Sequence, residues 1–416
     1  MNKHLLSLSI GAALLTASLP LAGQGRGRGG PPVNLPDGAG KDNVQTLCAN
    51  CHSLNTIVNS GGYTKDGWRT LVSTMVALPP DVGDTVTTYL ATNFPEKPRP
   101  PAVVIAGPVN VNFKEWAVPT LGSRPHDPLA TPDGGLWYTG QFSNRLGRVD
   151  MKTGAVKEFA LPTAESGPHG LTADNEGNIW FTANAKGYIG KLNPASGEVT
   201  NYQLPEAARD PHTPLFDQKG ILWFTVQGAN LVGRLDPKTK EIKLATSPTP
   251  RSLPYGLVIS SRGVPFFVDF GVNKIGSIDP ATMTITEYPL PNEETRPRRI
   301  AITSDDVLWY SDYSRGYLGR FDPKTGKATE WPSPGGPKSQ PYGITAHNDI
   351  IWYSESAVRP NTLVRFDPKT ETYTHYTTQD GLPDNVVQCI LRDRSGNLWL
   401  STNTAFPDST RVTIAS

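Results

Sequence analysis

One short motif in the chain has the residue types and spacing to hold a metal cofactor. Cys48 and Cys51 are separated by two residues, and His52 follows directly. On a helical turn, two such thiols can reach the vinyl groups of one porphyrin, and the imidazole then faces the iron. The alternatives are a redox cysteine pair, a zinc site and a local disulfide. The motif predicts one haem c, attached covalently through Cys48 and Cys51, with His52 as an iron ligand.

A second iron ligand is expected from Met75. The spacing of apolar residues predicts a helix over residues 65–77, and Met75 lies on its apolar face. The alternative is that Met75 only packs the core, as most helical methionines do. Its thioether is the one soft ligand available in this segment, so we expect it to complete the iron coordination. A second helix is expected over residues 81–93.

A second group of candidate residues recurs after prolines in the later part of the chain. If each one enters the innermost strand of a repeated sheet, they share one end of a central channel. Imidazoles there could carry protons or bind a metal ion, although a turn after proline also favours polar residues in general. The residues are His126, His169, His212, Tyr255, Arg298, Tyr342 and Asp384.

Polar residues also stand where each second strand should end, at the same end of the antiparallel pair. Together with the first group they predict a polar pocket for a small organic ligand. These residues are Gln141, Asn184, Gln227, Asp269, Asp312 and Glu355.

The elements that must position these residues follow from a repeat. An aromatic residue recurs every 43 residues, and each unit offers four short strands, which is typical of a β-propeller blade. Residues 112–119 match the fourth strand of a unit and are expected to close the last blade. Cys389 is expected to be a buried core thiol in that blade. The recurring residues are Trp137, Trp180, Trp223, Phe266, Trp309 and Trp352, with Trp399 displaced by an insertion.

The sequence therefore predicts a small all-α cytochrome c domain followed by an all-β seven-bladed β-propeller. The expected divisions are a signal peptide at 1–23, a flexible linker at 24–40, the haem domain at 41–95, a proline-rich linker at 96–111 and the propeller at 112–416. The signal predicts a periplasmic or secreted protein, with an uncleaved membrane anchor as the alternative. The 40 glycines and 39 prolines fit a turn-rich β fold, and the net charge of +1 offers no argument for nucleic acid.

Two resemblances add to these patterns. Residues 41–95 resemble short monohaem cytochrome c domains through Cys48, Cys51 and His52, the expected helix from Trp68 to Met75 and the terminal helix with Tyr89 and Leu90. The repeat resembles the streptogramin B (virginiamycin B) lyase family through Pro168-His169-Gly170 and residues 178–182 and 188–191, with their copies. That resemblance implies a seven-bladed propeller that opens a cyclic depsipeptide by elimination with Mg²⁺. It also implies two catalytic histidines after prolines in successive blades, and a glutamate four residues beyond the second blade's tryptophan.

In this chain the histidine pair is His126 with His169, or His169 with His212. The matching glutamate position holds Asn184 for the first pair and Gln227 for the second. An amide neither takes up a proton nor binds Mg²⁺ as a carboxylate does.

The leading functional expectation is electron transfer by the haem, with the propeller binding a substrate or an electron donor and a periplasmic electron-transfer partner. Whether the chain is an oxidoreductase or a lyase stays open at this stage. The alternatives are a carbon–oxygen lyase acting on a cyclic ester and a non-catalytic propeller that binds a ligand.

Overall fold

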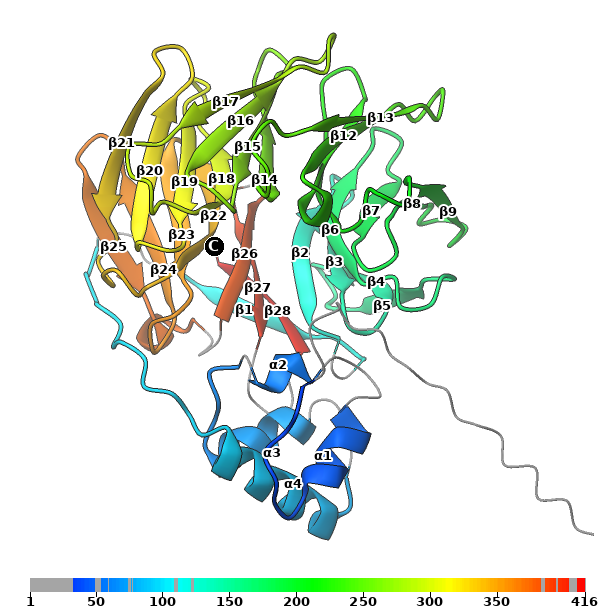
Figure 1. Ribbon diagram of the computed structural model, residues 1–416, viewed down its shortest axis with the longest axis vertical. Coiled ribbons are helices and arrows are strands. Elements are labelled where there is room, and N and C mark those ends of the chain that lie inside the picture. Colours follow the sequence, from blue (N-terminus) through cyan, green and yellow to red (C-terminus); the bar gives the residue numbers. More distant parts are fainter. Residues whose placement is uncertain are drawn as a thin grey trace, which may run out of the picture.

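The computed structural model describes residues 33–48, 54–58, 60–73, 76, 78–107, 111–120, 123–382, 386–393, 396–403 and 410–415. The expected signal peptide, Cys51, the expected iron ligands His52 and Met75 and the expected mouth residue Asp384 lie outside these residues. The side chain of Cys389, which was expected to be buried, also lies outside the description. Figure 1 shows a ring of β-sheets with a small group of helices gathered at one side of it.

The helical part is short and has a small core. Trp68 lies at its centre and donates a hydrogen bond from its indole nitrogen to the carbonyl oxygen of Phe94 at 3.0 Å. The side chains of Val44, Val86 and Leu90 are buried around it. The helices are α1 (Lys41–Cys48), α2 (Asn55–Val58), α3 (Lys65–Ser73) and α4 (Pro80–Asn93).

The predicted fold class needs a correction in this region. The described chain is nearly all β, and its helical residues do not show a cytochrome c domain. Cys48 is half-buried at the end of α1, while residues 49–53 lie outside the description. The physical reason is that a five-residue motif specifies one helical turn, whereas a domain needs a core, and the apolar cluster here is small.

The remaining residues confirm the propeller that the repeat predicts. The strands form seven four-stranded antiparallel sheets, six of them from consecutive strands. The first three are β2 (Pro125–Ala130), β3 (Gly135–Gly140), β4 (Arg145–Asp150) and β5 (Val156–Ala160); β6 (Pro168–Ala173), β7 (Ile179–Ala183), β8 (Tyr188–Leu192) and β9 (Val199–Gln203); and β10 (Pro211–Phe216), β11 (Leu222–Val226), β12 (Leu231–Leu235) and β13 (Ile242–Thr246).

The next three sheets repeat this order. They are β14 (Pro254–Ile259), β15 (Pro265–Asp269), β16 (Lys274–Ile278) and β17 (Ile285–Pro289); β18 (Pro297–Ile302), β19 (Leu308–Asp312), β20 (Tyr317–Asp322) and β21 (Lys327–Pro332); and β22 (Pro341–His347), β23 (Ile350–Glu355), β24 (Thr362–Asp367) and β25 (Thr372–Tyr376).

The last sheet joins the two ends of the repeat region. It contains β26 (Val386–Arg392), β27 (Leu398–Asn403), β28 (Thr410–Ala415) and β1 (Phe113–Ala117), and β1 pairs with β28 along its whole length. Trp116 of β1 also packs on Trp399 of β27, with ring centroids 5.9 Å apart. The ring therefore closes without an open sheet edge between its first and last strands.

The second strand of each blade explains why the sheets stack. In β7, β11, β15 and β19 every residue is buried, because both faces of the strand pack against neighbouring blades. Trp180 of one blade, for example, shares an apolar cluster with Leu222 and Phe224 of the next. Three of the recurring tryptophans also donate their indole N–H to an aspartate six residues earlier: Trp180 to Asp174, Trp223 to Asp217 and Trp399 to Asp393, at 2.8–3.0 Å.

Candidate functional site

The residues after the recurring prolines leave the regular ladder of the innermost strand. In β6 the register shifts between Pro168 and Leu171, which leaves His169 and Gly170 outside the regular pairing. The same shift follows the proline in β10, β14, β18 and β22, and β2 has it one residue later. Such a bulge re-aims the side chain that it releases. The bulge thus accounts for the placement of the residue after the proline in five blades, whereas His126 of β2 still pairs with Thr139 and the bulge follows it.

Hydroxyl groups of the second strands fix these bulges from the preceding blade. The side chain of Thr139 donates to the carbonyl oxygen of His169 at 2.9 Å, and Thr182 donates to that of His212 at 2.8 Å. Thr225 does the same for Tyr255 at 2.7 Å. All three hydroxyls are buried, so each bond is made away from water. The mouth residues are therefore positioned by the neighbouring blade as well as by their own strand.

The three predicted histidines lie in one continuous row. The ring centroids of His126 and His169 are 4.3 Å apart, and those of His169 and His212 are 3.9 Å apart. Tyr255 continues the row, 3.8 Å from His212. All four side chains are at least nine-tenths buried. The structure thus brings together residues that the sequence spaces 43 positions apart.

Burial keeps these histidines neutral near pH 7. Burial and the neighbouring His169 lower the pKa of His126 to about 3. Burial also lowers the pKa of His169. Burial lowers the pKa of His212 well below its usual value, and the proximity of His169 and Arg299 opposes its protonation further. A neutral imidazole can accept a proton. Since the charge of Asp127 raises the pKa of His169 against the effect of burial, His169 is the candidate general base of the row.

Asp127 and Arg299 complete this half of the site, and the sequence analysis did not identify either of them. Arg299 donates a hydrogen bond from its guanidinium to Asp127 at 3.0 Å, although 172 residues separate the two. Oδ1 of Asp127 lies 3.2 Å from Nδ1 of His126, and Oδ2 lies 3.6 Å from Nδ1 of His169. Burial would raise the pKa of Asp127, but Arg299 and His126 hold it well below its usual range. The carboxylate is therefore ionised and faces two neutral imidazoles.

The other half of the mouth is aromatic and cationic. Arg298 lies over the rings of Tyr342 and Tyr313, with its guanidinium carbon 4.3 Å from each centroid. The same carbon is 5.0 Å from Phe270 and 5.3 Å from Tyr255. The hydroxyls of Tyr255 and Tyr342 are hydrogen-bonded to each other at 2.9 Å. The structure therefore brings the predicted Tyr255, Arg298 and Tyr342 into contact.

The residues at the ends of the second strands hold loops. Asn184 donates to the carbonyl oxygen of Pro211 at 3.2 Å, and Gln227 begins the short 3-10 helix η1 (Gln227–Ala229). Asp312 accepts a hydrogen bond from the backbone of Arg296, and Glu355 accepts one from the side chain of Thr362. Both carboxylates are fully buried. These hydrogen bonds connect the ends of the second strands to neighbouring segments, and ligand binding by these residues stays a prediction.

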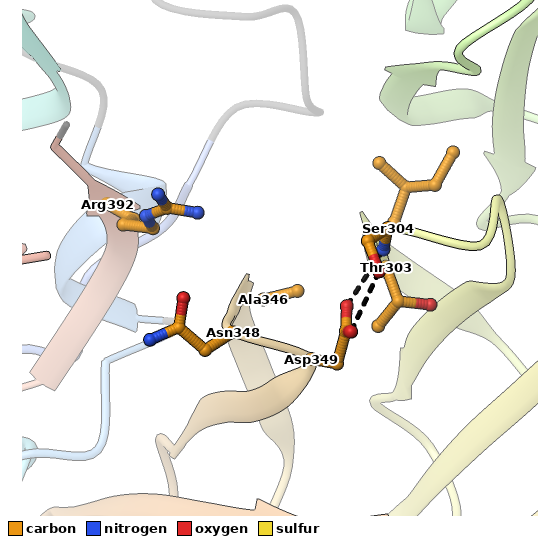
Figure 2. A pocket seen from close by; sticks show the side chains of 7 residues that line it. Thr303, Ser304, Ala346, Asn348, Asp349 and Arg392 are labelled. Atoms are coloured by element: carbon orange, nitrogen blue, oxygen red, sulfur yellow. Dashed lines mark hydrogen bonds between the residues drawn. The ribbon is translucent and has the colours of Figure 1, made fainter.

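A cavity of about 370 Å³ lies at the opposite end of the channel (Figure 2). The cavity lies where the inner strands end. The residues that line it include Ser304, Asn348, Asp349 and Arg392. Asp349 accepts hydrogen bonds from the backbone and side chain of Ser304, both at 2.8 Å. Since the histidines stand where the inner strands begin, this cavity and the histidine row are separate features.

Comparisons with known proteins concern the propeller. A family model described as the virginiamycin B lyase family matches residues 107–357, and one described as a two component regulator propeller matches residues 381–404. No curated protein matches the chain in a sequence comparison.

Solved structures agree with the family match. A streptogramin B lyase is 26% identical with a TM-score of 0.66, covering 74% of this chain and 98% of that one. Virginiamycin B lyase from Staphylococcus aureus is 24% identical with a TM-score of 0.66, covering 74% and 99%. The extracellular domain of a one component system from B. thetaiotaomicron is 15% identical with a TM-score of 0.55, covering 70% and 40%. The last two likenesses show the fold.

These findings correct the cofactor prediction. They support a lyase-like propeller, and both family matches lie outside residues 41–95, where haem c was expected. The expectations of haem, electron transfer and an electron-transfer partner are therefore not sustained. Of the four residues predicted to hold the haem, Cys48 alone is within the described part of the chain. None of the helices described combines the length and apolar character needed to cross a bilayer.

Proposed function

The chain belongs to the virginiamycin B lyase family, and on that premise we propose that its propeller is a carbon–oxygen lyase that opens a cyclic ester at the histidine row. The observation that carries this proposal is the row itself, in which neutral imidazoles follow prolines in successive blades and one carboxylate faces two of them. The presence of an extracellular domain among the similar folds supports an exported protein that meets its substrate outside the cytoplasm.

In the proposed reaction His169 is the general base. Oδ2 of Asp127 lies 3.6 Å from its Nδ1, and this negative charge favours the tautomer that carries the proton on Nδ1. Nε2 then accepts a proton from the carbon next to a carbonyl group. The electron pair of that C–H bond forms a carbon–carbon double bond. The ester C–O bond on the adjacent carbon breaks, and its electron pair leaves with the oxygen as a carboxylate. The products are an alkene and a carboxylate in one opened chain, and no water is consumed.

His126, Asp127 and His169 lie close enough together to hold a metal ion, but two of these three ligands are imidazoles, so the set does not fit the Mg²⁺ ion of the family resemblance. Mg²⁺ prefers several oxygen ligands in octahedral geometry. The positions that match the family's glutamate hold the amides Asn184 and Gln227, and the carboxylate of Asp127 is bonded to Arg299. The proposed reaction therefore assigns no role to a metal ion.

The test is ring opening of a streptogramin B-type cyclic ester, followed by mass spectrometry. Elimination leaves the mass unchanged, whereas hydrolysis adds one water. We expect His169→Gln to lower the rate about a hundredfold or more, because general-base catalysis typically contributes that much. His347→Gln is the matched control, since His347 lies at the other end of an inner strand. The unfolding midpoint of each variant checks its fold. A hydrolysed product, no product, or full activity in a folded His169→Gln protein contradicts the proposal.

A second candidate function is ligand binding without chemistry. The amides at positions 184 and 227 favour it, because they remove the carboxylate that the family resemblance implies. In that case a cyclic ester binds, as measured by calorimetry, and is recovered intact after long incubation.

A further inference from the structure

Arg298 is enclosed by aromatic rings. Its guanidinium carbon lies 4.3–5.3 Å from the ring centroids of Tyr255, Phe270, Tyr313 and Tyr342. Cation–π contacts of this kind offset part of the cost of removing an arginine from water. They leave the N–H groups of the guanidinium without an ionic acceptor, because a ring face accepts no strong hydrogen bond.

The charge of Arg298 also lacks a counter-ion within the described residues. No carboxylate in that part of the chain forms an ion pair with Arg298, and its Nε is buried without a hydrogen-bond partner. Two other arginines of the structure differ: Arg299 is bonded to Asp127, and Arg315 forms ion pairs with Asp312 and Glu330. A largely enclosed cation that has no anion among the described residues is costly, so a ligand that brings an anion gains that energy on binding.

The two neighbouring tyrosine hydroxyls add donors at the same place. Tyr255 and Tyr342 share one hydrogen bond of 2.9 Å, so at least one hydroxyl proton can turn to a ligand. A planar guanidinium and a hydroxyl are the donors that carboxylates prefer in proteins. Tyr255 also contacts His212, with ring centroids 3.8 Å apart, which places this group next to the histidine row.

We propose that Arg298, Tyr255 and Tyr342 form a subsite for an organic carboxylate. The inference rests on the proposed function, because the carboxylate released by the elimination is the group that this subsite would hold. Arg298 then stabilises the negative charge that develops on the leaving oxygen, and the aromatic rings favour a ligand whose carboxylate is attached to an apolar body.

Binding of benzoate and benzamide to the full chain tests the subsite without turnover. The two probes have nearly the same shape and differ in charge, so calorimetry isolates the contribution of the anion. We expect benzoate to bind at least about tenfold more tightly than benzamide, the value of one charge-assisted hydrogen bond. Arg298→Met should abolish that preference, and Tyr342→Phe should reduce it while leaving the charge in place.

Arg392→Met is the matched control, because Arg392 lines the cavity at the opposite end of the channel. Equal binding of benzoate and benzamide by the wild-type protein overturns the subsite. An unchanged benzoate preference in Arg298→Met also overturns the subsite, and if that variant does not fold, an unchanged preference in Tyr342→Phe does so. Loss of the preference in the control Arg392→Met overturns it as well. If the protein opens the ring but does not bind benzoate, the subsite proposal is wrong and the lyase proposal stands. If the protein binds benzoate through Arg298 but does not open the ring, the anion site stands and the lyase proposal is wrong.

Discussion

Asp269 stands at the end of β15 as a buried carboxyl group whose ionisation opposes folding. Its side chain is fully buried, and neither oxygen has a hydrogen-bond partner among the described residues. Burial therefore raises its pKa from 3.8 to about 7. Replacing it by asparagine keeps the shape of the side chain and removes the charge, which makes Asp269→Asn a direct test of this burial.

The size of the effect follows from the two pKa values. The unfolded chain ionises Asp269 near 3.8, whereas the folded chain resists ionisation until about 7. The protonated carboxyl group of Asp269 contributes stability that is fully present below pH 3.8. This contribution is lost as the pH rises through the folded-state pKa of about 7. At about 1.4 kcal/mol for each tenfold change in proton affinity, the loss amounts to about 4 kcal/mol above the window.

The assay is urea unfolding of the wild-type protein and Asp269→Asn at about pH 5 and about pH 8. We expect the free energy of unfolding of the variant to exceed that of the wild type at the higher pH, and the difference to grow by about 3 kcal/mol between the two conditions. The control is Asp306→Asn. Partial burial would raise the pKa of Asp306, but the hydroxyl and backbone N–H of Ser261 donate to this carboxylate and hold its pKa below the usual value, so its loss should lower stability by the same amount at both pH values. A difference between wild type and Asp269→Asn that does not change with pH refutes the reasoning.

Three further substitutions test how the blades are held together. Asp217→Ala removes the acceptor 3.0 Å from the indole N–H of Trp223 and should lower the free energy of unfolding by about 1–3 kcal/mol, measured by urea unfolding. Trp116→Ala removes the closing strand's packing on Trp399 and should cost about 3 kcal/mol, with earlier exchange of the amides in β28. Thr182→Val removes the buried hydroxyl that donates a hydrogen bond to the carbonyl oxygen of His212 in the next blade. It should lower the free energy of unfolding by about 1–2 kcal/mol and slow ring opening. An unchanged rate of ring opening would contradict the role of that hydrogen bond.

Much of the propeller could be predicted from the chain alone, because each blade is encoded locally. A fully buried second strand reads as a continuous apolar run, and the turns around it recur at a constant spacing. The same spacing predicted that His126, His169 and His212 share one end of the channel, and the contacts between their rings agree with this placement.

The helical segment shows where local pattern is a weaker guide. The spacing of Cys48 and Cys51 specifies a possible attachment of a cofactor, but it says nothing about the surrounding core. The comparisons place the chain with lyase-like propellers and do not sustain the haem-based function. A motif of a few residues carries less information about function than a repeat that extends over most of the chain.

By itself, the sequence determined the blade repeat, the prolines that precede the mouth residues and the amides Asn184 and Gln227 at the matched glutamate positions. Only the tertiary structure decided that Asp127 meets Arg299 across the channel and that four aromatic rings surround Arg298. The physical reason is that hydrogen bonding within a blade depends on neighbouring residues. Contacts across the channel depend on the curvature accumulated over several blades, which no local pattern contains.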